Sequence, residues 1–246
     1  MNYRNIVIII GLLLPFMNRA MAQTQFVGWF ASFNTFKINT RFSIHGEVQL
    51  RSTDQLDHLQ TLLLRTGLNY HVNSRLMITA GYGYIPNRRV LAGIAGYAPE
   101  SRIFEQLQYT HPLALGQSKG TLAHRLRIEQ RFIPKSYIQN NEFKNDGNVY
   151  SNRVRYFIRN IMPLHAWSDK GTAPFLALQN EVFVNVGDKS GVNGEFFDQN
   201  RAYIAFGYRF HKKFDAELGY MNQYVNGRDK AFTNNHIVQV ATYVRL

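Results

Sequence analysis

The sequence predicts an all-β fold: a single transmembrane antiparallel β-barrel of about 10–12 strands that follows a cleaved signal peptide. Three observations predict this class. Apolar and polar residues alternate with period two in segment after segment. The first 22 residues have the pattern of an export signal, and links of two contrasting lengths separate the segments. No stretch after residue 22 resembles a transmembrane helix, so the mature chain could cross a membrane only as strands.

The chain begins with a predicted signal peptide, residues 1–22. Arg4 precedes an apolar run over residues 6–17, and small residues follow at Ala20 and Ala22. The run is shorter than the roughly 20 residues that a spanning helix needs, so we expect cleavage after Ala22. No cysteine follows that site, which excludes the bacterial lipoprotein route. Residues 23–246 then form the predicted outer-membrane barrel domain.

The composition is basic and lacks cysteine. The 246 residues include 28 Lys and Arg against 16 Asp and Glu, a formal net charge of +12, and only Arg4 and Arg19 of these cations fall in the predicted signal. A basic balance suits nucleic acid, an anionic membrane surface or small anions, and export argues against nucleic acid as a partner. The absence of cysteine excludes disulfides, thiol catalysis and Cys-ligated metals.

Eleven segments of strand character follow one another along the mature chain. Gly, Asn, Asp and Pro cluster between them, as turns require. The stretch HRLRIEQRF, residues 124–132, is typical, because Arg or Glu alternates with mostly apolar side chains. Each such segment predicts a strand with one apolar and one charged face. The segments are 25–36, 40–51, 58–71, 75–86, 101–111, 120–133, 149–163, 174–186, 199–211, 214–225 and 234–246.

Two of these segments leave questions open. In 101–111, Glu105 shares its parity with Ile103, Leu107 and Tyr109, so the faces cannot be assigned. Single-chain bacterial barrels have even strand numbers, and a C-terminus in the periplasm makes 40–51 the first of ten strands. Segment 25–36, with Trp29, is then an extra strand, a segment in the lumen, or a sign of a twelfth strand.

The links between the segments alternate in length. Residues 38–40, 72–74 and 211–213 are short, whereas 87–100, 134–148, 187–198 and 226–233 are longer and are expected to be loops. Short turns at one end and long loops at the other are typical of a transmembrane barrel whose long loops face the outside.

Alternation alone does not show which face points inward, since a secreted lipocalin-like barrel would put its apolar face inside. Aromatic residues near strand ends suit interfacial girdles around an outward apolar face; they are Phe132, Tyr150, Tyr208, Phe210, Tyr220 and Tyr224. The charged face is dominated by Arg and Glu, which pair in bidentate fashion and can pack inside a lumen. The C-terminal strand resembles the signal read by the barrel-insertion machinery, with Leu246 in place of the usual Phe.

The charged faces together predict a charge network in the lumen, because a cation facing lipid would cost roughly 2–4 kcal/mol at mid-bilayer. The network forms either a structural plug of ion pairs or a narrow anion-favouring channel, and we favour the plug because small barrels are filled by side chains. Its predicted members are Arg41, Glu47, Arg51, Arg65, Arg75, Arg125, Arg127, Glu129, Arg131, Arg153, Arg155, Arg159, Glu181, Arg201, Arg209, Asp215 and Glu217.

The alternative function is an outer-membrane lipid-modifying hydrolase or acyltransferase. It rests on polar residues at apolar parity, His124 beside Gln130 and also Asn180, with no serine in a distinctive motif nearby. No catalytic residue, metal site or cofactor is predicted, since no His pair has ligand spacing. Outer-membrane lipid, lipopolysaccharide phosphates near Arg88-Arg89, and small anions are the expected partners.

Several phrases together resemble domain-of-unknown-function family 2490, which is common among exported proteins of Bacteroidota. They are EQL at 105–107, HRLRIEQRF at 124–132, RVRYFIR at 153–159, NEVFVN at 180–185, FFDQNR at 196–201 and GYMNQY at 219–224, with Trp29 near the mature start. The resemblance implies an outer-membrane barrel and no established activity, so it assigns no functional residue. The expected protein is thus a porin-like, non-enzymatic barrel in the bacterial outer membrane.

Overall fold

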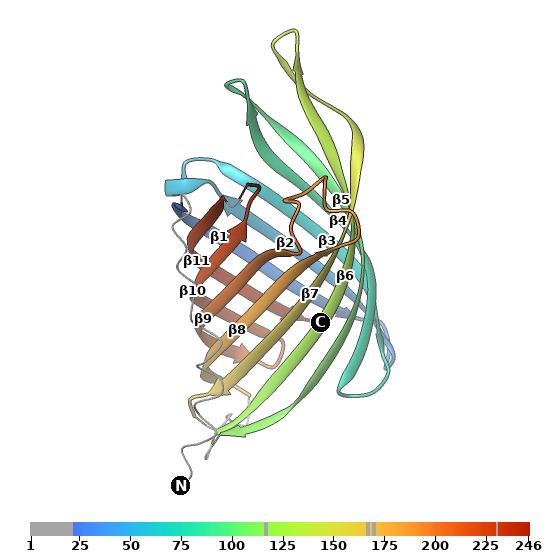
Figure 1. Ribbon diagram of the computed structural model, residues 1–246. Helices are drawn as coiled ribbons and strands as arrows, with labels where there is room; N and C mark the ends of the chain where they lie inside the picture. The colour runs from blue at the N-terminus through green and yellow to red at the C-terminus, as the bar shows by residue number, and fades with distance from the viewer. Residues whose placement is uncertain (1–21, 116–117, 166–167, 169–170, 230) are drawn as a thin grey trace.

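A computed structural model of the chain describes residues 22–115, 118–165, 168, 171–229 and 231–246. Within these residues eleven strands form one closed barrel, each strand bonded to its neighbours in sequence (Figure 1). The predicted all-β class is confirmed. The predicted signal peptide lies outside the described residues, apart from Ala22. No helix in the described part of the chain is long and apolar enough to span a membrane.

The strands are β1 (Ala22–Lys37), β2 (Phe42–Ser52), β3 (Leu59–His71), β4 (Leu76–Leu91), β5 (Ile94–Leu115), β6 (Ser118–Gln139), β7 (Glu142–Pro163), β8 (Ala173–Val186), β9 (Phe197–His211), β10 (Phe214–Asn226) and β11 (Phe232–Arg245), and a short 3-10 turn, η2 (Asp54–Leu56), lies between β2 and β3.

The barrel closes through a parallel pair, β1 with β11, whereas all other neighbouring strands are antiparallel. Each hairpin reverses the chain, so an eleventh strand runs in the direction of the first, and closure must then be parallel. The pairing extends from Ala22↔Phe232 to Thr35↔Arg245. Segment 25–36 is therefore the extra strand, one of the three alternatives left open above. Eleven strands lie within the expected 10–12, and the parallel β1–β11 pair departs from the antiparallel arrangement expected.

The start of β1 has no strand neighbour on its β2 side, because that pairing begins at Trp29↔Arg51. The link between β2 and β3 supplies the missing acceptors. The Phe26 amide donates to the Asp54 carboxylate at 2.8 Å, and the Gly28 amide donates to the Ser52 hydroxyl at 2.8 Å. This loop therefore covers an edge that would otherwise be open to pairing with another chain.

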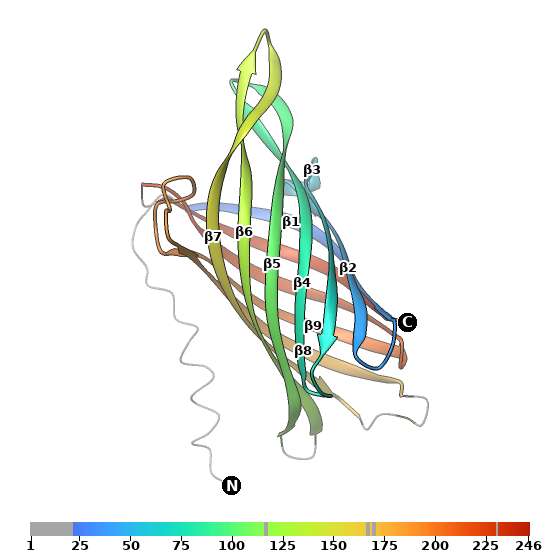
Figure 2. The same ribbon diagram turned by 90° about the vertical axis from the view of Figure 1, so that its right-hand side faces the viewer.

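Two long hairpins project from one end of the barrel (Figure 2). Strands β5, β6 and β7 have 22 residues each, against 11 in β2. Residues 87–100 and 134–148, expected to be loops, instead continue the β4–β5 and β6–β7 hairpins. The Asn145 amide donates to the Tyr97 carbonyl at 2.9 Å, and the Phe143 ring occupies the space that a Cβ at Gly96 would need. The two hairpins thus support each other. We call this end of the barrel the hairpin end, and the end with residues 38–41 and 72–75 the turn end.

The β4–β5 hairpin turns at Ala92 and Gly93, which have φ angles of 47° and 80°. Two central residues with positive φ are typical of a type I′ turn, for which Asn-Gly is the preferred pair. We expect Ala92→Asn to stabilise this hairpin by about 0.5–1 kcal/mol, since Ala is strained there and Asn is not. Amide hydrogen exchange along residues 87–98 measures the change. Gly93→Ala is the opposing control, and faster exchange in Ala92→Asn would contradict the turn assignment.

Apolar side chains cover the outside of the barrel. They occupy alternate strand positions, and examples exposed by 44–59% are Ile103, Leu126, Ile204, Leu218 and Val240. In β5, Phe104 and Gln106 point inward and are buried, whereas Glu105 points outward with Ile103 and Leu107. An apolar belt this continuous is not typical of a monomeric protein in water.

The interior has two parts. A cluster of buried apolar residues lies on β1 and β8–β11, centred on Trp29, Phe175, Tyr203 and Met221. Buried charged and amide side chains make up the other part and lie on β2, β3 and β5–β11. Inward positions of β1, β8 and β10 thus carry apolar side chains that the predicted charge network does not include.

Candidate functional site: an Arg/Glu network inside the barrel

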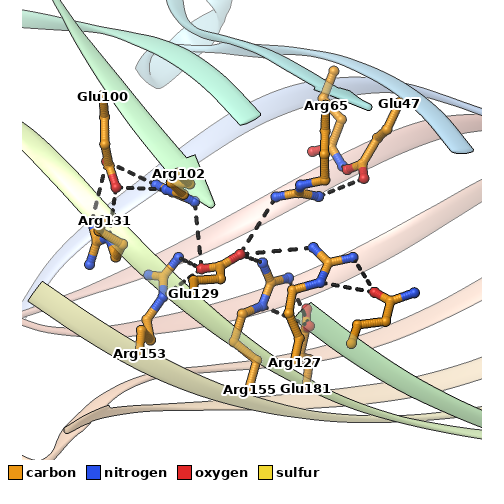
Figure 3. A network of polar contacts seen from close by, with 12 residues as sticks. Glu47, Arg65, Glu100, Arg102, Arg127, Glu129, Arg131, Arg153, Arg155 and Glu181 are labelled. Carbon is orange, nitrogen blue, oxygen red and sulfur yellow. Dashed lines mark hydrogen bonds and ion pairs between the residues drawn. The ribbon is translucent and has the colours of Figure 1, made fainter. Parts of the chain in front are cut away.

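Glu129 on β6 lies at the centre of the charge network and has no solvent exposure (Figure 3). Its carboxylate accepts hydrogen bonds from Arg153 Nη2 at 2.7 Å and Arg155 Nη1 at 2.6 Å, both on β7. Three more guanidinium groups lie 3.7–3.9 Å from its oxygens, those of Arg65 on β3, Arg102 on β5 and Arg127 on β6. Ion pairs from four strands therefore converge on one carboxylate.

Further carboxylates surround this centre and share its arginines. Arg65 pairs with Glu47 at 2.5 Å, and Arg153 with Asp198 at 2.8 Å. Glu181 and Glu100 each accept from two guanidinium groups: Glu181 from Arg125 and Arg155, both at 2.8 Å, and Glu100 from Arg102 and Arg131, at 2.6 Å and 2.7 Å. Each peripheral acid therefore helps to fix the position of at least one arginine that also lies near Glu129.

A second group of ion pairs lies nearer the turn end. Arg159 on β7 donates to Glu217 on β10, which also accepts from the hydroxyls of Tyr203 and Tyr243. Asp215 accepts from Arg209 at 2.7 Å and 3.0 Å and pairs with Arg245 at 2.7 Å. Since β7 and β10 are not neighbours in the sheet, the Arg159–Glu217 pair connects strands through the interior rather than along the wall.

Aromatic rings make cation–π contacts with several of these arginines. Arg127 and Arg65 lie 4.6 Å and 5.4 Å from the Phe104 ring, and Arg155 lies 4.5 Å from the Phe183 ring. Cation–π contacts of this kind offset part of the cost of burying a guanidinium group. The sequence contains a signal for these contacts, because Phe183 shares the parity of Glu181 in NEVFVN.

Most of the predicted network residues lie inside the barrel and contact one another. Those with a carboxylate or guanidinium partner are Glu47, Arg65, Arg125, Arg127, Glu129, Arg131, Arg153, Arg155, Arg159, Glu181, Arg209, Asp215 and Glu217. Sequence reasoning missed Glu100, Arg102, Asp198 and Arg245. Glu100 and Asp198 lay in stretches expected to be loops, and Arg102 in the segment whose faces could not be assigned.

Four predicted residues stand apart from the ion pairs. Arg41 and Arg75 are wrong assignments to the lumen: both are exposed in turns, one residue before β2 and β4 begin, so strand parity does not apply to them. Arg51 and Arg201 do point inward, yet neither lies in ion-pair contact with a carboxylate among the described residues. They bond to amide oxygens of Gln49 and Gln199 instead.

A cavity of about 1090 Å³ runs beside the network. Its described lining residues include His71 and Thr110 near the turn end and Arg88 and Arg228 at the hairpin end. Fourteen arginines line it, against the four carboxylates of Glu47, Glu100, Glu181 and Asp198. The lumen is therefore not filled completely, and the remaining space is strongly cationic.

The polar residues of the outer face do not form a hydrolase-like group in the described part of the chain. His124 Nδ1 lies 2.8 Å from the Tyr156 hydroxyl, and its ring stacks on His111 with centroids 5.7 Å apart. Gln130 donates to Glu105 at 3.1 Å, and Asn180 bonds to Asn200. Among the described residues, His124 has no hydrogen bond to a serine hydroxyl or a carboxylate. No group of His, Asp and Glu suited to a metal ion occurs among the described residues.

Comparisons with known proteins give a family for this chain and no activity. The model of the family described as "Protein of unknown function (DUF2490)" matches residues 26–234, from β1 to β11. An uncharacterized protein of Methylorubrum extorquens is 25% identical over 201 residues, which cover 81% of this chain and 78% of that protein. No solved structure matches the chain.

Proposed function

This chain belongs to the DUF2490 family of proteins of unknown function, and we propose that it is a non-enzymatic outer-membrane β-barrel whose lumen is closed to bulk solute by its Arg/Glu network. The observation that carries the proposal is the position of Glu129, fully buried and contacted by arginines from β3, β5, β6 and β7. Ion pairs that cross the interior occupy part of the space through which a solute would pass, and this supports closure at the level of Glu129.

The exposed apolar belt supports a membrane location. Exposing this apolar belt to water would be energetically unfavourable. With the faces exchanged, the arginines would lie in lipid, which is also unfavourable. The hairpin end, where the long links lie, is then the outer surface, and the C-terminus lies on the periplasmic side. The predicted signal peptide would deliver the chain to that compartment.

A second candidate, a narrow anion-favouring channel, is favoured by the cationic cavity that residues from both ends line. Rings of Arg select anions in pores. The two candidates differ in whether the network leaves a continuous path. They can be separated by electrical recording.

We expect the refolded wild-type barrel to show no steady conductance in a planar lipid bilayer, and the Glu129→Ala/Arg155→Ala variant to show one. This pair opens the centre while most of the neighbouring charges keep a partner: Arg153 keeps Asp198, Glu181 keeps Arg125, and Arg65 keeps Glu47. Arg127 keeps its hydrogen bonds to the Gln106 amide oxygen. Glu142→Ala/Lys144→Ala, an exposed ion pair on the β6–β7 hairpin, is the matched control and should stay silent. A steady anion-selective current from the wild type would overturn closure and establish the channel.

A further inference from the structure

Arg51 on β2 and Arg201 on β9 are two inward cations whose charge no neighbouring carboxylate of the described chain neutralises by ion-pair contact. Both guanidinium groups lie over the ring of Trp29, 4.0 Å and 5.0 Å from its centroid. Arg201 is only 9% exposed. Both line the cationic cavity near the hairpin end, since β2 ends at Ser52 and β9 begins at Phe197.

The hydrogen-bond and ring partners of these two arginines are neutral, and the carboxylates of Glu47 and Glu181 act on them from beyond ion-pair distance. Arg51 Nε and Nη2 donate to the Gln49 amide oxygen at 3.0 Å and 2.6 Å. Arg201 Nη2 donates weakly to Gln199 at 3.3 Å, and its guanidinium also lies 4.7 Å from the Phe183 ring. By contrast, Arg153 and Arg155 each contact two carboxylates. A buried cation with only amide and aromatic partners remains costly, and an anion in contact with it would remove that cost.

The chemistry around the pair suits a small oxyanion. Guanidinium groups present planar, paired N–H donors that match the oxygens of phosphate and carboxylate. The amide group of Gln223 lies in the same cavity lining and bonds to Gln199 at 2.5 Å, so neutral donors and acceptors lie beside the cations. Arg88, Arg89 and Arg228 line the cavity toward its mouth, where their field would concentrate anions.

We propose that Arg51 and Arg201, supported by Trp29, form a binding site inside the lumen for a small oxyanion of the phosphate class. This proposal goes beyond closure of the lumen. An anion needs to enter only from the hairpin end, so the site can bind it whether or not the barrel conducts. The indole ring keeps the two guanidinium groups on one side of the cavity, and the amides of Gln49, Gln199 and Gln223 complete its polar wall.

Calorimetric titration of the refolded full-length mature chain with sodium phosphate, in detergent micelles and phosphate-free buffer, tests the site. We expect saturable binding to the wild type and affinity at least about tenfold weaker in Arg51→Gln/Arg201→Gln, since each lost charge-assisted contact is worth about that factor or more. Arg41→Gln/Arg75→Gln removes the same charge from exposed turns at the other end and should bind as the wild type does.

A Trp167→Phe variant leaves Trp29 as the single tryptophan, so its fluorescence should change on adding phosphate and not on adding sodium chloride of equal ionic strength. Retained β-sheet circular dichroism shows that each variant is folded. Absence of binding to the folded wild type would overturn the site, as would equal weakening in the turn variant or an equal response to chloride. Because binding is measured in micelles, its failure is distinguishable from a failure of lumen closure.

Discussion

Replacing Glu129 with glutamine is expected to lower the free energy of unfolding by about 3–5 kcal/mol. Glutamine keeps the volume of the side chain, so the loss reports charge rather than a cavity. The buried carboxylate bonds to Arg153 and Arg155 and lies near Arg65, Arg102 and Arg127. Without its negative charge, these largely buried guanidinium groups repel one another with no carboxylate between them. Urea unfolding of the protein refolded into lipid vesicles measures the change.

Glu142→Gln is the control for this substitution. Glu142 pairs with Lys144 at 3.3 Å on the β6–β7 hairpin, with its side chain 69% exposed, and exposed pairs contribute about 0–1 kcal/mol. Adding Arg155→Gln to Glu129→Gln should recover part of the loss, giving a coupling energy of about 0.5–3 kcal/mol in a double-mutant cycle. A Glu129→Gln protein as stable as the Glu142→Gln control would show that the network does not stabilise the barrel.

The network also explains how a small number of residues can hold a barrel in shape. Arg65 on β3 with Glu129 on β6, and Arg159 on β7 with Glu217 on β10, join strands that are three places apart in the sheet. Such pairs fix the cross-section of the barrel, which neighbouring backbone hydrogen bonds alone do not. Closure of the lumen and stability of the fold therefore depend on the same side chains.

The sequence predicts the faces of the strands well because facing is a local property. Period two determines that Arg125, Arg127 and Glu129 share one side of β6, whatever surrounds the strand. The same reasoning gave eleven segments, and eleven strands form. It failed at Arg41 and Arg75, because parity does not show where a strand begins, and a turn residue one position away is free to face water.

The partners across the lumen could not be predicted in this way. Which arginine meets Glu129 depends on strand order, register and closure, and these are set by contacts between residues far apart in sequence. The parallel β1–β11 pair is an example. An odd number of strands requires parallel closure, but the number is known only when every segment is known to be a strand. The extended hairpins were not predicted, because 87–100 has two Gly, one Pro and two Arg and lacks regular alternation. Their order depends on contacts such as Phe143 with Gly96.

Replacing Ile204 with arginine is expected to destabilise the barrel by about 2–4 kcal/mol in lipid vesicles, if the apolar belt faces the bilayer as we propose. Ile204 lies in the middle of β9, is 47% exposed, and pairs with Leu178 and Tyr220 on the neighbouring strands. No acidic side chain occupies these paired positions, so an arginine there would face hydrocarbon without a counter-charge. Urea unfolding in vesicles and the folded yield after insertion both measure the penalty.

Tyr137→Arg provides the matched control. Tyr137 is 42% exposed on the β6 part of the long hairpin, beyond the barrel wall, so its replacement should change stability by no more than about 0.5 kcal/mol. In a barrel surrounded by water the two substitutions would be equally mild, because both place a charge on an exposed strand position. A large difference between them therefore requires lipid around Ile204, and equal small effects would overturn the membrane location, while leaving the fold and its internal ion pairs unchanged.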